Sequence, residues 1–158
     1  MSEADEDATP TERLARLGIQ LPQIVAPVGS YAPARRSGSY IFTSGQLPMV
    51  GGAMAATGKV GGTVAPDVAK DMARACALNA LAAIAGLVDL DSVRRVVKVV
   101  GYVASTADFT GQPAVVNGAS DVLAQIFGSE GVHARSAVGV VALPLDAPVE
   151  VELIVEVG

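Results

Sequence analysis

The sequence predicts an α+β domain in which one β-sheet carries two helices on one face. Three segments lead to this prediction: a β-branched run over 93–104, an apolar pattern of helical period over 112–127, and an alternating segment over 149–157. Buried strands are apolar runs, amphipathic helices repeat every 3.6 residues, and half-buried strands alternate. The predicted order of elements is β-β-α-β-α-β-β, with both helices on the same face of a single sheet.

The first half of the domain supplies two strands and a long helix. Ile24–Val28 and Ser39–Ser44 are predicted to be strands joined by a turn rich in glycine, serine and arginine. Pro66–Ala85 follows as a helix, because proline suits the first turn and Gly86 is a natural end. The β-branched run over 93–104 is the next strand, and it is expected to be buried on both faces along much of its length.

A short segment precedes the domain. Residues 1–9 are acidic and are expected to be disordered, whereas Pro10–Leu17 is predicted to be one short helix that ends at Gly18. We therefore divide the chain into an N-terminal extension over residues 1–19 and one domain over residues 20–158.

The composition limits the possible functions. The chain has 158 residues, of which 51% are hydrophobic and 17% charged, so one domain can fill a core, and the apolar excess favours an oligomer. A net charge of -5 argues against non-specific nucleic-acid binding. The single cysteine, Cys76, is interpreted as a small buried side chain and allows no disulfide within the chain. No membrane segment or targeting signal is recognised, so a cytoplasmic location is expected.

Arg135 is the most unusual residue, because it lies among small apolar residues in a predicted strand over 133–143. A buried cation needs an anion. One candidate is a carboxylate of the last strand, Glu150 or Glu152, if these two strands pair as a hairpin. The other candidate is the carboxylate of a ligand.

Several separated motifs resemble the RidA/YjgF family of reactive-intermediate deaminases, over about residues 20–157. These motifs are Val28–Ala34 followed by Tyr40–Pro48, Val116-Asn117, Ala134–Val138, Leu143-Pro144 and Val149–Glu152. The resemblance implies a chorismate-mutase-like fold with a mixed sheet. It also implies a homotrimer with a central β-barrel, helices outside and three clefts between subunits.

The resemblance also implies an activity. The chain would be a 2-iminobutanoate/2-iminopropanoate deaminase-like hydrolase that converts enamines and imines of the 2-aminoacrylate type to 2-keto acids and ammonia in the clefts between subunits. Neither a metal nor an organic cofactor would be used. Arg135 would clamp the substrate carboxylate, and Glu150 would orient or activate the attacking water.

The remaining site residues follow from the same resemblance. The backbone N–H of Gly45 would help to hold the substrate beside Ser44, and Tyr31 would line or close the cleft. Asn117 would approach from a neighbouring subunit. Ala137 stands where the best-known branch has a ligand-contacting cysteine, so the chain resembles a subgroup that lacks this cysteine.

Other readings compete with this one. His133, the only histidine, is interpreted as a structural residue in preference to a proton donor, and one histidine with one cysteine makes a zinc site improbable. The alternative function is that of a non-catalytic, regulatory trimer that binds small carboxylates. In that case Arg135 would still bind the carboxylate, and Glu150 would be only a structural partner.

Overall fold

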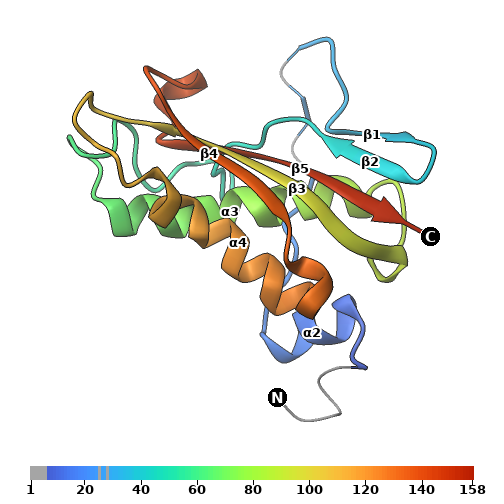
Figure 1. The fold of residues 1–158 in the computed structure, drawn as a ribbon. Coiled ribbons are helices and arrows are strands. Elements are labelled where there is room, and N and C mark those ends of the chain that lie inside the picture. Colours follow the sequence, from blue (N-terminus) through green and yellow to red (C-terminus); the bar gives the residue numbers. More distant parts are fainter. Residues whose placement is uncertain (1–6, 25, 28) are drawn as a thin grey trace.

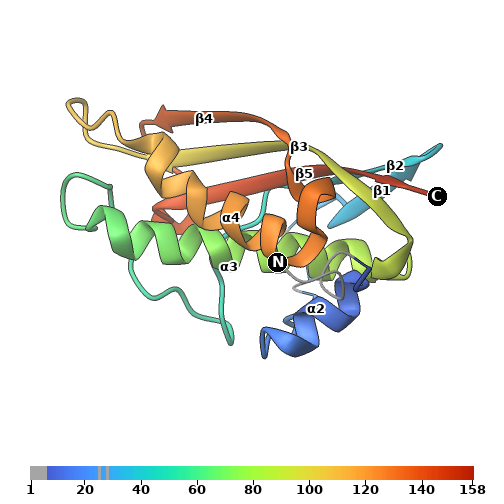
Figure 2. The ribbon, with the colours of Figure 1, turned by 60° about the horizontal axis from the view of Figure 1, so that its bottom comes forward.

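The computed structural model describes residues 7–24, 26–27 and 29–158, and they form one sheet with helices on one side (Figure 1). The strands are β1 (Ala34–Ser37), β2 (Tyr40–Thr43), β3 (Val93–Ala104), β4 (Ala134–Val140) and β5 (Val149–Val157). The helices are α2 (Pro10–Arg16), α3 (Pro66–Ala85) and α4 (Gln112–Phe127). Figure 2 shows α3 and α4 side by side beneath the sheet, which confirms the predicted α+β layering.

The sheet is mixed, with the strand order β1-β2-β5-β3-β4. The pairs β1–β2, β2–β5 and β3–β5 are antiparallel, whereas β3 and β4 are parallel. A parallel neighbour requires a crossover, and α4 supplies it. The predicted order of elements is confirmed, but β3 lies between β4 and β5, so the two last strands do not form a hairpin.

The core lies between the sheet and the two long helices. Leu153 and Val155 of β5 and Val99 of β3 are almost completely buried, because alternate residues of these strands face α3 and α4. Gly101 allows this close packing, since a Cβ atom there would lie 2.5 Å from Val116 Cγ2 of α4. Cys76 is fully buried in α3, as expected, and burial raises the pKa of its thiol well above the ordinary value.

The first predicted strand is wrong. Within Ile24–Val28, residues 24, 26 and 27 lie outside any strand, and residues 25 and 28 lie outside the described residues. The first strand is β1, over Ala34–Ser37, which pairs with β2 through a two-residue turn in which Gly38 has a positive φ of 60°. An edge strand tolerates exposed charges, and Arg35 and Arg36 are such charges. They interrupt the apolar pattern from which a strand is predicted, so the sequence does not indicate β1.

The predicted N-terminal helix is α2, and it is fixed at its start by a capping box. The Thr9 hydroxyl accepts a hydrogen bond from the Glu12 N–H, and the Glu12 carboxylate accepts one from the Thr9 N–H. Leu14 is buried, and α2 packs against α4. Ala8 is also buried, so the expected disorder of residues 1–9 does not hold for Ala8 and Thr9, and residues 1–6 lie outside the described residues.

None of the described helices is long and apolar enough to span a bilayer.

Candidate functional site

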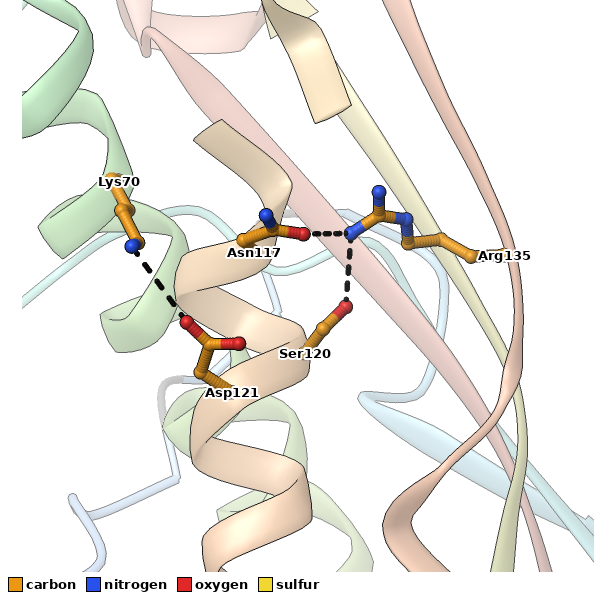
Figure 3. Close-up of polar contacts among 5 residues, drawn as sticks. All are labelled: Lys70, Asn117, Ser120, Asp121 and Arg135. Carbon is orange, nitrogen blue, oxygen red and sulfur yellow. Dashed lines mark hydrogen bonds and ion pairs between the residues drawn. The ribbon is translucent and has the colours of Figure 1, made fainter. Parts of the chain in front are cut away.

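Arg135 extends from β4 toward α4, on the helix-covered face of the sheet. It lies opposite Val99 of β3, which in turn lies opposite Leu153 of β5, and both neighbours are buried under the helices. Its Nη1 donates hydrogen bonds to Asn117 Oδ1 at 2.6 Å and to Ser120 Oγ at 3.2 Å (Figure 3). The guanidinium therefore binds two neutral oxygens, both on α4.

No carboxylate of the described residues forms an ion pair with Arg135. The nearby Asp121 turns instead toward Lys70 of α3, at 3.7 Å (Figure 3). Nε and Nη2 of Arg135 have no acceptor in the part of the chain that the structure describes. The arginine is thus half-buried with its positive charge unpaired, which is the arrangement that an external anion can complete.

An open cavity of about 300 Å³ lies in front of this guanidinium; we call it the arginine pocket. Its lining residues come from α4, from the turn after α4 and from β4: Asn117, Ser120, Asp121, Ala124, Gly131, Val132, His133 and Arg135. Helix geometry explains the two polar contacts. Asn117 and Ser120 are three positions apart, so they share a face of α4, while Val116 and Ala119, each one position before them, point into the core.

His133 continues the hydrogen-bond network. Its Nε2 lies 2.9 Å from Ser120 Oγ, and its Nδ1 lies 2.6 Å from the carbonyl oxygen of Gly131. Burial is the main cause that lowers the pKa of His133 below its ordinary value of 6.5, and the charge of Arg135 lowers it further. The imidazole is therefore neutral at neutral pH. The expected structural role agrees with this position, and sequence reasoning missed Ser120 entirely.

Glu150 lies on the opposite face of the sheet, which no helix covers. It pairs with Tyr102 of β3 and lies against Gly45, where a Cβ atom would be 2.8 Å from Glu150 Cδ. Glu152, two residues along the same strand, accepts a hydrogen bond of 3.2 Å from the Tyr102 hydroxyl. We call Gly45, Tyr102, Glu150 and Glu152 the glutamate face.

Partial burial is the main cause that raises the pKa of Glu150 above its ordinary value of 4.5, and the like charge of Glu152 raises it further. No lysine or arginine nitrogen of the described residues forms an ion pair with either carboxylate. A carboxylate with a raised pKa is a better proton acceptor near neutral pH than an ordinary one. The glutamate face can thus accept a proton from a water molecule.

The loop beside Glu150 is anchored by Ser44. The Ser44 hydroxyl donates to the Ala32 carbonyl at 2.6 Å, and the Ser44 N–H donates to the Pro33 carbonyl at 2.8 Å. These bonds hold Tyr31 near Gly45, and both residues line a small cavity of about 110 Å³. The Gly45 N–H has no acceptor among the described residues. Tyr31, Ser44, Gly45 and Glu150 are therefore brought together.

The far end of this loop is tethered to α3. The buried side chain of Asn79 donates from Nδ2 to the carbonyls of Leu47 at 2.9 Å and Met49 at 3.0 Å. Gln46 also exchanges two backbone hydrogen bonds with Val151 of β5, of 2.8 and 3.1 Å. Residues 46–49 are therefore fixed both to α3 and to β5.

Arg135 and Glu150 do not meet within one chain. Arg135 lies at the same level along the sheet as Leu153 of β5, with Val99 of β3 between them. Glu150 is three residues away from Leu153 along β5, so it lies about 10 Å from Arg135 along the strands and about 10 Å across them. The two side chains also leave opposite faces. The carboxylates of β5 are therefore not the partners of Arg135, because β3 separates the two strands.

Asn117 and Ala137 belong to the half of the molecule that contains Arg135. Asn117 forms a hydrogen bond with Arg135 of its own chain, whereas the resemblance implied an approach from a neighbouring subunit. Ala137 shares the face of Arg135, packs against the core and lies opposite Gly101 of β3, outside the lining of the arginine pocket. In the described residues no three histidine, cysteine, aspartate or glutamate side chains are arranged to hold a metal ion.

The comparisons with known proteins agree with this fold. The family model described as "YjgF/chorismate_mutase-like, putative endoribonuclease" matches residues 11–157. Protein TCP17 of Trypanosoma cruzi is 47% identical over 149 residues, which are 92% of this chain and 92% of that protein.

Two solved structures extend the comparison. The crystal structure of Atu1372 from Agrobacterium tumefaciens matches with a TM-score of 0.85 and 43% identity, over 95% of this chain and 94% of that one. TdcF of E. coli, solved with bound serine, matches with a TM-score of 0.60 and 27% identity, over 86% and 94%. With the family model matching almost its full length, and with this mixed sheet and helix arrangement, the chain belongs to the YjgF/RidA family.

Proposed function

We propose that this protein hydrolyses enamines and imines derived from amino acids to 2-keto acids and ammonia, without a cofactor, at sites shared between subunits of a homotrimer. The observation that carries the proposal is the guanidinium of Arg135 at an open pocket, where its acceptors among the described residues are the neutral oxygens of Asn117 and Ser120 alone. A cation kept free of protein carboxylates is suited to bind a substrate carboxylate. The structure of TdcF with serine is that of a relative holding a small molecule with a carboxylate and an amine.

The chemistry needs two groups. Arg135 holds the carboxylate of the substrate, and a water molecule lies between Glu150 and the imine carbon. As the water oxygen bonds to this carbon, Glu150 accepts one proton from the water and passes it to the nitrogen, which gives a carbinolamine. Glu150 then accepts the remaining hydroxyl proton and passes it to the nitrogen as the C–N bond breaks, so that ammonia leaves and the water oxygen remains as the keto oxygen. The imine carbon is already electrophilic, so positioning supplies most of the rate.

Both groups come together only if two chains contribute. Arg135 and Glu150 leave opposite faces of one sheet, so a complete site combines the arginine pocket of one copy with the glutamate face of another. The uncovered sheet face also presents exposed apolar side chains, namely Tyr40, Phe42 and Val138, each 44% exposed. Exposed apolar surface of this kind favours association. In the proposed trimer, these faces form a central barrel.

Complementation between two inactive variants tests the proposal. Arg135→Ala retains Glu150, and Glu150→Gln retains Arg135, so each variant alone should release 2-keto acid from freshly generated 2-aminoacrylate at only a small fraction of the wild-type rate. Refolded together in equal amounts, they should regain activity, because about a quarter of all sites would combine an intact arginine with an intact glutamate in random mixing.

The same experiment separates the alternatives. A mixture no more active than its components, with mixed oligomers present by native mass spectrometry, would rule out the shared site. A wild-type protein that binds 2-keto acids saturably but turns over none of a broad imine panel would instead be a small-carboxylate-binding protein. Asp108→Asn, at an exposed position outside the lining of the arginine pocket and outside the glutamate face, is the control for refolding.

A further inference from the structure

We propose that Ser120 and His133 are positioning residues that orient Arg135, so that only its Nε–Nη2 edge is offered to a ligand. This inference rests on the proposed function in one respect, namely that the ligand is a small carboxylate. It assigns a role to a serine and a histidine for which the reaction itself has no use. The observation behind it is a continuous chain of hydrogen bonds from the Gly131 carbonyl to the guanidinium.

The direction of every hydrogen bond in this chain is determined. The Gly131 carbonyl can only accept, so Nδ1 of His133 carries the proton and donates it. In the neutral imidazole Nε2 is then an acceptor, and the Ser120 hydroxyl donates to it. The hydroxyl hydrogen of Ser120 is thus used in the bond to His133, and the Ser120 oxygen accepts a hydrogen bond from Nη1 of Arg135. The tautomer of His133 thus makes Ser120 an acceptor for the arginine.

The two acceptors occupy both hydrogens of Nη1. One points to Asn117 Oδ1 at 2.6 Å and the other to Ser120 Oγ at 3.2 Å. The other three N–H groups remain on Nε and Nη2, and two of them are parallel, which matches the two oxygens of a carboxylate. In Figure 3 the bonded nitrogen of Arg135 faces α4, and the other terminal nitrogen points away from Asn117 and Ser120.

The charges around the network explain why its acceptors are neutral. A carboxylate at the position of Ser120 would pair with the guanidinium and compete with the ligand. Asp121, the one acidic side chain among the described residues that line the arginine pocket, is paired with Lys70. Glu130, in the turn before His133, is paired with Arg95. The arginine is therefore held firmly while its charge stays available.

Binding of pyruvate, used as a simple 2-keto acid probe and measured by calorimetry on the assembled protein, tests the proposal. Ser120→Ala and His133→Leu should each weaken binding about 10-fold, because the guanidinium loses an oriented acceptor. His133→Gln should bind within about 2-fold of wild type, because its amide oxygen can still accept from Ser120. Ser129→Ala, a surface serine near the same turn, should leave the affinity unchanged.

A cycle with Arg135→Ala shows whether the effect passes through the arginine. In that background Ser120→Ala should have no further effect on pyruvate binding. An equal 10-fold loss in both backgrounds would overturn the proposal, as would unchanged binding in Ser120→Ala and His133→Leu, or a wild-type protein that does not bind pyruvate. Melting curves identify variants that merely fail to fold, and His133→Gln then decides whether the acceptor is what matters.

Nuclear magnetic resonance gives a readout independent of binding. His133 is the only histidine of the chain, so its ring nitrogens can be assigned without ambiguity. Nδ1 should be protonated and Nε2 bare at neutral pH, and Arg135→Gln should raise the pKa of His133 by removing a nearby positive charge. The opposite tautomer would overturn the proposal.

The two proposals can fail separately. A protein that binds pyruvate with this pattern of variants but hydrolyses no imine loses the proposed function and keeps the positioning residues. A protein whose imine hydrolysis depends on Arg135 but not on Ser120 or His133 loses only the positioning residues. In the active case, Ser120→Ala should raise KM and leave kcat nearly unchanged, because it weakens ground-state and transition-state binding alike.

Discussion

The arginine pocket and the glutamate face manage charge in opposite ways. In the pocket, one cation is bound by neutral acceptors, and Asp121, which lines the pocket, is paired with Lys70. On the glutamate face, two carboxylates share a small area with a phenol. Partial burial is the main cause that raises the pKa of Glu150, and the like charge of Glu152 raises it further. One region therefore holds a stable charge, and the other holds a charge that changes easily with protonation.

This difference fits a division of labour in the proposed reaction. A binding group must keep its charge at every pH at which the substrate is present, and an arginine held by neutral partners does so. A proton-transfer group must gain and lose a proton at accessible pH, which the crowded carboxylates favour. The following predictions test each side of this contrast, from the largest expected effect to the smallest.

The largest effect is expected when Glu150 loses its ability to accept a proton. Glu150→Gln should lower kcat about 1,000-fold, within the range typical of a removed general base. The wild-type rate should fall as the pH is lowered through the pKa of Glu150, which lies above 4.5, because only the ionised form accepts a proton. A pH profile of kcat measures both. If the variant retains the acidic fall in rate, Glu150 is not the titrating group.

The next largest effect is expected when the guanidinium of Arg135 is replaced by an ammonium group, which has the same charge but a different shape. Arg135→Lys should lower kcat/KM about 100-fold, because an ammonium cannot offer two parallel N–H groups to a carboxylate while bonding to α4. Steady-state kinetics with 2-aminoacrylate measures the change. A lysine variant as active as wild type would show that charge alone suffices in the arginine pocket.

A smaller effect is expected from crowding the glutamate face without touching its charges. Gly45→Ala should lower kcat/KM about 10-fold, since the new Cβ atom would lie 2.8 Å from Glu150 Cδ and must displace the carboxylate. Pyruvate binding at the arginine pocket should change less than the rate. Ala55→Gly, at an exposed position in the following loop, is a control that should leave the rate unchanged.

The smallest effect concerns stability. Burial and Glu152 make the folded protein hold the proton of Glu150 more tightly than the unfolded chain does, so stability falls as the pH rises from 4.5 through the folded pKa. Glu150→Gln removes this loss and should raise Tm at pH 7 by about 2 °C, with no gain in acid. Differential scanning fluorimetry over pH measures the difference, and an equal gain at all pH values would contradict the stated cause.

Elements with a strong periodic pattern could be predicted from the sequence. Both long helices begin at or next to a proline and end beside a glycine, and β5 alternates along most of its length, so all three have their predicted bounds. β1 could not be found this way, because Arg35 and Arg36 break the apolar pattern of this edge strand. Its place depends on pairing with β2, which is a tertiary effect.

The candidate site was predictable residue by residue but not in its arrangement. The motifs identified Arg135 and Glu150, yet adjacency in sequence suggested a hairpin where β3 intervenes. The helix between β3 and β4 was the available signal, because a helical crossover usually joins parallel neighbours. Ser120 was also within reach, since it lies three positions from Asn117 and therefore on the same face of the predicted helix.

The two hydrogen bonds from Asn79 to the loop after Gln46 have a consequence for the evolution of this chain. The segment over 50–64 follows residues 46–49, which are hydrogen-bonded to α3 through Asn79 and to β5 through Val151. Insertions or deletions beyond Met49 should therefore not displace Gly45, because the hydrogen bonds to Asn79 and Val151 hold the backbone between them in place. The long loop can diverge in length and composition while the backbone next to Glu150 stays where it is.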